Sequence, residues 1–189
     1  MTSRFRESLR LPDFEYLKDG AYFVTIVTQN RACLFGSIVE EEMKLNEAGM
    51  MIDQVCREIT GIIQGIYLDD YQIMPNHYHG IIVIEYGVGA GLRACPGRTQ
   101  PQETAGSSGR VVPIEKGVSL PEIVGRFKSL TTHRYIEGVK KNHWEPFDRR
   151  LWQRNYFERV IRNEREHQAI SDYIFCNPRN WEKDEEYPC

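Results

Sequence analysis

Two runs of β-branched and aromatic residues, joined by a two-residue turn, constrain the fold of this chain more than any other feature. The runs cover residues 66–74 and 77–85, and Pro75 and Asn76 lie between them. Such runs are typical of strands, and strands joined by a short turn pair antiparallel. Residues 21–28 form a third run of this kind. We therefore expect a sheet built around a central antiparallel pair.

Apolar residues at helical spacing predict three helices. We expect them at about residues 40–62, 120–136 and 164–176. Ser119 is a suitable N-cap for the second helix, and Pro178 ends the third because proline disfavours helical geometry in the preceding residue. A short strand is expected within residues 151–160. The resulting order, β-α-β-β-α-β-α, predicts an α+β fold, a ferredoxin-like α/β sandwich with a central antiparallel sheet.

Length and composition are those of one soluble globular domain spanning residues 1–189. The chain has 41% hydrophobic and 27% charged residues, and five cysteines without a C-x-x-C pair, which favours reduced thiols. No apolar run approaches the roughly 18 residues of a membrane helix, and the N-terminus lacks a signal-peptide core. A cytoplasmic protein is expected. Residues 87–110 are rich in Gly, Pro, Ser, Thr and Gln, which predicts a flexible insertion.

Charge is distributed unevenly along the chain. The net charge is −3, but residues 126–166 contain eleven Lys and Arg against six Asp and Glu. A basic segment within an acidic chain permits a phosphate-binding surface. A mixed, solvated helix face is the alternative interpretation of the same charges.

Two histidines stand where the strand at 77–85 begins. His77 and His79 are separated by one residue, Tyr78. Side chains alternate along a strand, so both imidazoles point to one face, with Cα atoms roughly 6.5–7 Å apart, and Tyr78 points to the other. This spacing suits two ligands of one divalent metal, which needs at least one further protein ligand. Two ordinary surface histidines are the alternative.

The helix at 164–176 supplies a partner for the histidines. Tyr173 and Asn177 are four residues apart, so they lie on one helix face, one turn apart. A phenol can act as nucleophile once a metal or base activates it, and an amide oxygen can ligate a metal. The alternatives are a packed, half-buried Tyr173 and a nucleophile at Tyr156, whose aromatic neighbours favour packing.

Taken in order along the chain, these motifs resemble the REP-associated tyrosine transposases. These belong to the HUH-type, single-tyrosine superfamily of the insertion-sequence 200/605 class. The resemblance covers most of the chain and rests on residues 10–16, 20–31, 35–36, 74–79, 151–157, 162–164 and 173–178. Tyr78 departs from the family pattern, which usually has a bulky hydrophobic residue between the histidines.

The resemblance implies the HUH endonuclease fold, with the tyrosine on a C-terminal helix. It implies that His77, His79 and Asn177 bind Mg²⁺ or Mn²⁺, and that Tyr173 attacks single-stranded DNA near a hairpin such as a REP palindrome. The products would be a 5′-phosphotyrosine link and a free 3′-hydroxyl, which can later rejoin the strand. The protein would then be nucleoid-associated, either a monomer or a homodimer.

The basic segment supplies candidates for contacts with the DNA backbone. They are Arg126, Lys128, Arg134, Lys140, Lys141, Arg149, Arg150 and Arg154. Two other functions remain open. One is a catalytically silent module that binds DNA hairpins, and the other is a metal-dependent hydrolase that uses water as nucleophile.

Overall fold

The structure, a computed structural model, describes residues 19–85 and 117–188. Its main sheet has four strands, all antiparallel, in the order β4-β5-β1-β6. The strands are β1 (Gly20–Val27), β4 (Ile66–Ile73), β5 (His77–Ile84) and β6 (Phe157–Ile161). The strands predicted at 21–28, 66–74 and 77–85 are thereby confirmed. The predicted insertion at 87–110 and the motif at 10–16 lie outside the described residues.

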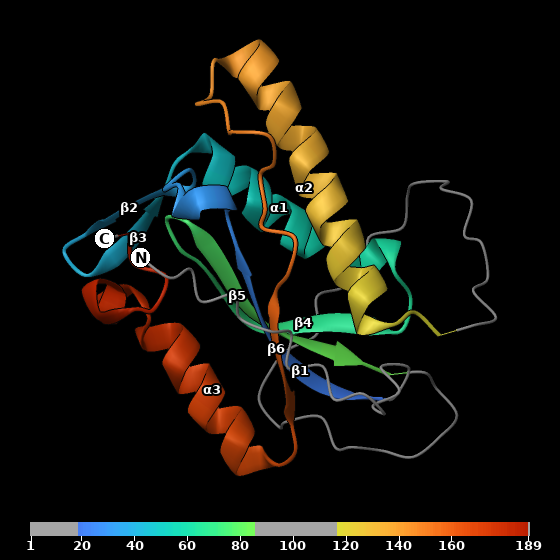
Figure 1. The fold of residues 1–189 in the computed structure, drawn as a ribbon. Coiled ribbons are helices and arrows are strands. Elements are labelled where there is room, and N and C mark those ends of the chain that lie inside the picture. The colour runs from blue at the N-terminus through green and yellow to red at the C-terminus, as the bar shows by residue number, and fades with distance from the viewer. Residues whose placement is uncertain (1–18, 86–116, 189) are drawn as a thin grey trace, which may run out of the picture.

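Helices cover both faces of the sheet (Figure 1). α1 (Glu47–Ile62) and α2 (Leu120–Asn142) pack on one face, and α3 (Glu164–Cys176) lies on the other. The four strands with α1 and α2 follow the βαββαβ order of a ferredoxin-like sandwich. The predicted α+β fold with an additional C-terminal helix is confirmed. None of the helices within the described ranges is long and apolar enough to cross a membrane.

Alternation along β1 separates the two faces of the sheet. Tyr22 and Val24 belong to the large core cluster that β1 forms with α1 and α2. Phe23, between them, belongs to a second, smaller cluster with Ile170 and Ile174 of α3. The face under α3 is therefore held by few apolar side chains, and its remaining positions are open to polar groups.

The prediction that a helix begins at about residue 40 is wrong. Residues 36–45 form a small hairpin, with strands β2 (Gly36–Val39) and β3 (Glu42–Leu45). Glu40 and Glu41 close it with left-handed backbones, at φ of 51° and 62°. The helix begins only at Glu47, because the Asn46 side chain caps it by accepting the Gly49 N–H at 2.9 Å.

Two other boundaries differ from the prediction. The helix that begins after Ser119 is confirmed, and the Ser119 N–H donates to the Glu122 carboxylate at 2.9 Å. It runs beyond residue 136 to Asn142, where His143 adopts a left-handed conformation. The strand expected within 151–160 begins only at Phe157, because Trp152 forms just an isolated bridge with Thr28.

Candidate metal centre and tyrosine

β5 carries both histidines to the face of the sheet under α3. Their rings lie 4.3 Å apart, centroid to centroid. Tyr78 packs into the large cluster on the opposite face, in agreement with the predicted alternation. Its ring extends along the strand over Gly80, where any Cβ would overlap the phenol. Glycine at this position therefore allows a tyrosine between the two histidines.

His77 is completely buried and is held by its neighbour in the turn. Its Nδ1 lies 2.8 Å from Oδ1 of Asn76, and the Asn76 amide donates to the backbone oxygens of Arg31 and Glu186. These bonds make Asn76 Oδ1 the acceptor and His77 Nδ1 the donor. The other ring nitrogen, Nε2, is buried without a hydrogen-bond partner among the described residues. Its lone pair is therefore available to a ligand.

His79 is held across the sheet. Its Nδ1 lies 2.9 Å from Oγ1 of Thr25, its register partner on β1. Phe23, from the same strand, stacks on the imidazole at 5.4 Å between centroids. The other nitrogen of the ring, Nε2, lies 3.3 Å from the hydroxyl of Tyr173. Both histidines thus use Nδ1 for support and direct Nε2 toward α3.

α3 brings the predicted nucleophile to this place. Ile170 and Ile174 fix the helix on the sheet, and the ring of Tyr173 meets Phe23 edge-on at 6.0 Å. Tyr173 is 46% exposed, so its hydroxyl touches His79 while part of the ring faces solvent. Tyr156, the other tyrosine considered, packs against the large cluster on the opposite face of the sheet.

Asn177 ends α3 and lies buried beside the histidines. Its Nδ2 donates to Oδ2 of Asp184 at 2.8 Å. Its Oδ1 is buried and has no hydrogen-bond partner among the residues that the structure describes. The amide thus presents an unsatisfied oxygen in the same place as the unsatisfied Nε2 of His77.

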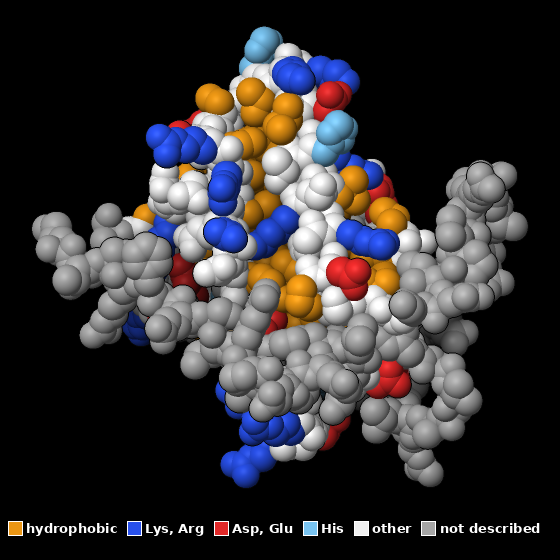
Figure 2. All heavy atoms as spheres, turned by 45° about the vertical axis from the view of Figure 1, so that its right-hand side comes forward, with side chains coloured by type: hydrophobic (Ala, Val, Ile, Leu, Met, Phe, Trp, Pro, Cys, Tyr) orange, Lys and Arg blue, Asp and Glu red, His pale blue; other side chains and the backbone are white. Residues whose placement is uncertain are grey.

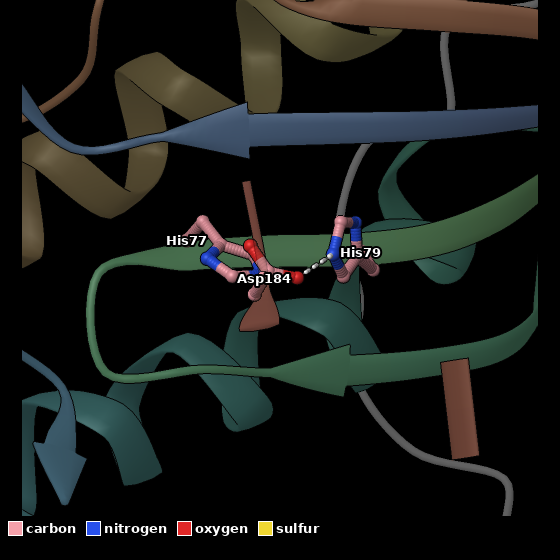
Figure 3. Close-up of side chains that lie close together, drawn as sticks. All are labelled: His77, His79 and Asp184. Carbon is pink, nitrogen blue, oxygen red and sulfur yellow. Dashed lines mark ion pairs between the residues drawn. The ribbon is translucent and has the colours of Figure 1, made fainter. Parts of the chain in front are cut away.

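Asp184 also lies in the site, although the sequence predicted no functional residue in this part of the chain. The 3-10 helix η2 (Pro178–Lys183) follows Asn177 and returns the chain to the histidines. Figure 3 shows the Asp184 carboxylate between His77 and His79, with the dashed pair to His79 at 3.9 Å. Ligand atoms of these three residues all lie within 4.8 Å of one another.

Four contacts fix the chain around Asp184. The backbone N–H of Glu186 donates to Asp184 Oδ1 at 2.7 Å, and the Tyr173 hydroxyl lies 3.3 Å from Oδ2. The Glu186 carboxylate forms an ion pair with Arg31 at 3.0 Å. Trp181, in η2, places its ring 5.8 Å from the His77 ring. The Asp184 carboxylate is therefore held in a fixed position in the site.

Burial and the carboxylate set the protonation of the site. Burial and the neighbouring His79 lower the pKa of His77 to about 3, so this imidazole is neutral at physiological pH. Burial opposes ionisation of Asp184, but the nearby His79 and hydrogen bonds from Asn177 and the Glu186 N–H hold its pKa below the ordinary value. Burial and the Asp184 carboxylate raise the pKa of Tyr173. The site thus contains neutral imidazole, carboxylate and phenol.

These residues fit a divalent metal. Two buried acceptor atoms, His77 Nε2 and Asn177 Oδ1, have no partner among the described residues, which is costly unless a ligand satisfies them. A neutral imidazole and a carboxylate are the forms that bind metals. Asn76 and Thr25 orient the two rings through Nδ1, as outer partners do in metal sites.

The eight basic candidates lie on α2 and on the segment that follows it. Figure 2 shows Lys and Arg side chains on both sides of an apolar strip on the α2 side of the molecule. Four of them are engaged within the protein. Lys128 donates to the carbonyls of residues 153, 154 and 155 at 2.9–3.3 Å. Arg134 pairs with Glu58, Lys141 with Glu137, and Arg149 with Asp148.

Comparisons with known proteins place this chain beside one close relative. A Haemophilus influenzae protein, described only as uncharacterised, is 38% identical over 185 residues, which are 96% of this chain and 93% of the relative. No protein-family model matches the sequence.

Two solved structures match this chain. A REP-associated tyrosine transposase bound to a REP hairpin matches with a TM-score of 0.55 and 16% identity, over 89% of this chain and 72% of that one. A Deinococcus radiodurans protein matches with a TM-score of 0.44 and 17% identity, over 84% of this chain and 90% of its own. At 16% identity, the first match shows a common fold with the transposase.

Proposed function

We propose that this chain, which belongs to the same family as the Haemophilus influenzae protein, is a metal-dependent endonuclease and strand transferase for single-stranded DNA at hairpins. The observation that carries the proposal is the Tyr173 hydroxyl, which lies 3.3 Å from Nε2 of His79 beside two unsatisfied buried acceptors. The transposase with the common fold is bound to a REP hairpin, which supports a hairpin substrate.

His77, His79 and Asp184 hold the metal in this proposal, and Asn177 Oδ1 is a further ligand. Nitrogen and hard oxygen donors together suit Mn²⁺ or Mg²⁺. When bound, the ion polarises the scissile phosphate and stabilises the charge that develops on it. The Asn177 amide also donates to Asp184, so it fixes the carboxylate at the same time.

Tyr173 is the nucleophile of the proposed reaction. Its oxygen forms a bond to phosphorus while the bond between phosphorus and the 3′-oxygen breaks, which leaves a 5′-phosphotyrosine link. The phenol proton passes to solvent, since Tyr173 is 46% exposed, and the leaving 3′-oxygen takes up a proton to become a 3′-hydroxyl. An incoming 3′-hydroxyl reverses these steps and rejoins the strand without ATP.

The proposal is tested with DNA hairpins that carry single-stranded flanks, incubated with the protein and Mn²⁺. We expect a covalent adduct on a denaturing gel, and peptide mass spectrometry should locate the oligonucleotide on Tyr173. Tyr173→Phe should form no adduct, and Tyr156→Phe, the matched control, should retain it.

Three outcomes would contradict the proposal. An adduct on Tyr156 would assign a different nucleophile. Cleavage that persists in Tyr173→Phe would indicate a hydrolase that uses water. Hairpin binding by the wild-type protein with neither cleavage nor adduct would indicate a silent binding module.

A further inference from the structure

A cavity of about 600 Å³ opens beside the metal centre, between the β2–β3 hairpin and η2. Figure 1 shows these two segments next to each other, at the left of α3. Pro75, just before the histidine strand, and Pro178, just after Asn177, both line the cavity. Trp181 connects it to the centre through its contact with His77. The volume is within the usual range for small-ligand sites, roughly 300–1,000 Å³.

Two aromatic side chains form part of the cavity wall. Trp181 and Tyr187 both line it, and their rings meet edge to face at 5.2 Å between centroids. Both rings are only partly covered by the rest of the chain. Partly exposed aromatic faces are the platforms on which unpaired bases stack in proteins that bind single strands.

The charges on the wall favour a base over a phosphate in the cavity itself. Three carboxylates line it, from Glu40, Glu41 and Glu182, against two cations, Arg179 and Lys183. Carboxylates only accept hydrogen bonds, so they suit the amino groups of adenine, cytosine and guanine. Thymine has no exocyclic amino group and offers them less.

We propose that this cavity binds an unpaired nucleobase next to the cleaved phosphate, and that it prefers amino-bearing bases to thymine. The base stacks on the ring of Trp181 beside Tyr187, and its amino edge meets Glu40 and Glu41. Arg179 and Lys183 are the cations on the same wall that are suited to the flanking phosphates. The inference rests on the proposed function, because that function makes single-stranded DNA the substrate.

The test measures binding of the dinucleotides dApdA, dCpdC, dGpdG and dTpdT by tryptophan fluorescence. We expect dTpdT to bind at least roughly fivefold more weakly than the others, the effect of about one lost hydrogen bond to a base edge. The fluorescence change should disappear in Trp181→Phe, because Trp144 and Trp152 do not line the cavity.

The base preference is tested with a double variant of the protein, in the turn between β2 and β3. Glu40→Gln with Glu41→Gln should bring dTpdT to within about twofold of the others, since an amide both donates and accepts. Glu42→Gln, on the same hairpin but not in the cavity wall, is the matched control and should keep the preference. Circular dichroism checks that each variant is folded.

Equal affinity for all dinucleotides, a preference that survives the double variant, or a fluorescence change that persists in Trp181→Phe would each overturn the inference. The measurement needs no cleavage. A missing adduct on Tyr173 therefore contradicts the proposed function alone, and a missing base preference contradicts the cavity alone.

Discussion

Thr25 and His79 face each other on the paired strands β1 and β5, and the Thr25 hydroxyl lies 2.9 Å from Nδ1 of His79. Thr25 is buried, so no water replaces this bond when the hydroxyl is removed. The bond orients the ring so that Nε2 faces Tyr173. The pairing of β1 with β5 thus determines that His79 presents Nε2, and not Nδ1, to a metal.

Thr25→Val should therefore weaken metal binding without unfolding the protein. Valine has nearly the same shape but leaves His79 Nδ1 without its partner. Loss of such an outer partner costs about 10- to 100-fold in metal affinity. Calorimetric titration with Mn²⁺ measures the effect, and Thr132→Val on α2 is the control. Unchanged Mn²⁺ affinity in Thr25→Val would show that the bond does not orient the ring for a metal.

Asp184→Asn should weaken Mn²⁺ binding by more than Thr25→Val does, because it removes a proposed ligand and its charge. An asparagine keeps the shape and still accepts the Glu186 N–H. Glu185→Gln, one residue further along, removes the same charge from an exposed position and is the matched control. Equal Mn²⁺ affinity in the wild-type protein and Asp184→Asn would exclude the carboxylate from the metal site.

Much of the fold could be predicted because its strands carry strong signals. The run at 77–85 and the turn before it locate β5 to within one residue. The β2–β3 hairpin could not be predicted, because apolar residues there continue the helical spacing of α1. Its turn uses Glu40 and Glu41 in left-handed conformations, where glycine or asparagine is the usual signal.

Sequence spacing predicted four residues of the candidate site, but it did not predict the fifth, Asp184. His77, His79, Tyr173 and Asn177 belong to regular elements, whose periods indicate a common face. Asp184 follows the short 3-10 helix η2, which is kinked at Asn180, and it stands in an acidic stretch that suggests a solvated tail. Its role depends on the return of the chain after Pro178, which only the three-dimensional structure shows.

The basic surface should contribute to DNA binding through side chains that have no acidic partner in the described part of the chain. Arg150 and Arg154 form no ion pair among the described residues, whereas Lys141 is paired with Glu137. Arg150→Gln with Arg154→Gln should weaken hairpin binding and lower the salt dependence by about one unit per lost phosphate contact. Lys141→Gln is the control. An unchanged salt slope in the double variant would remove these arginines from the interface.

Lys128 should act on stability and not on DNA. Burial lowers its pKa to about 8 from 10.5, although three carbonyls accept its hydrogen bonds. Between these values the unfolded chain keeps a proton that the folded chain has released, so this lysine makes the free energy of unfolding rise with pH. Urea unfolding from pH 8 to 10 should show a smaller rise in Lys128→Met than in Lys141→Met. Equal rises would contradict the burial of this charge.

Gly80 should be irreplaceable because Tyr78 lies over it. A Cβ at Gly80 would overlap the Tyr78 ring and displace it from the core, at a cost of about 1–3 kcal/mol in the free energy of unfolding. Gly125 in α2 is the matched control, since a Cβ there meets no atom within 4 Å. Gly125→Ala should stabilise the protein by up to about 1 kcal/mol, because alanine favours the helix. Urea unfolding measures both, and a Gly80→Ala protein as stable as the wild type would show that the phenol moves aside freely.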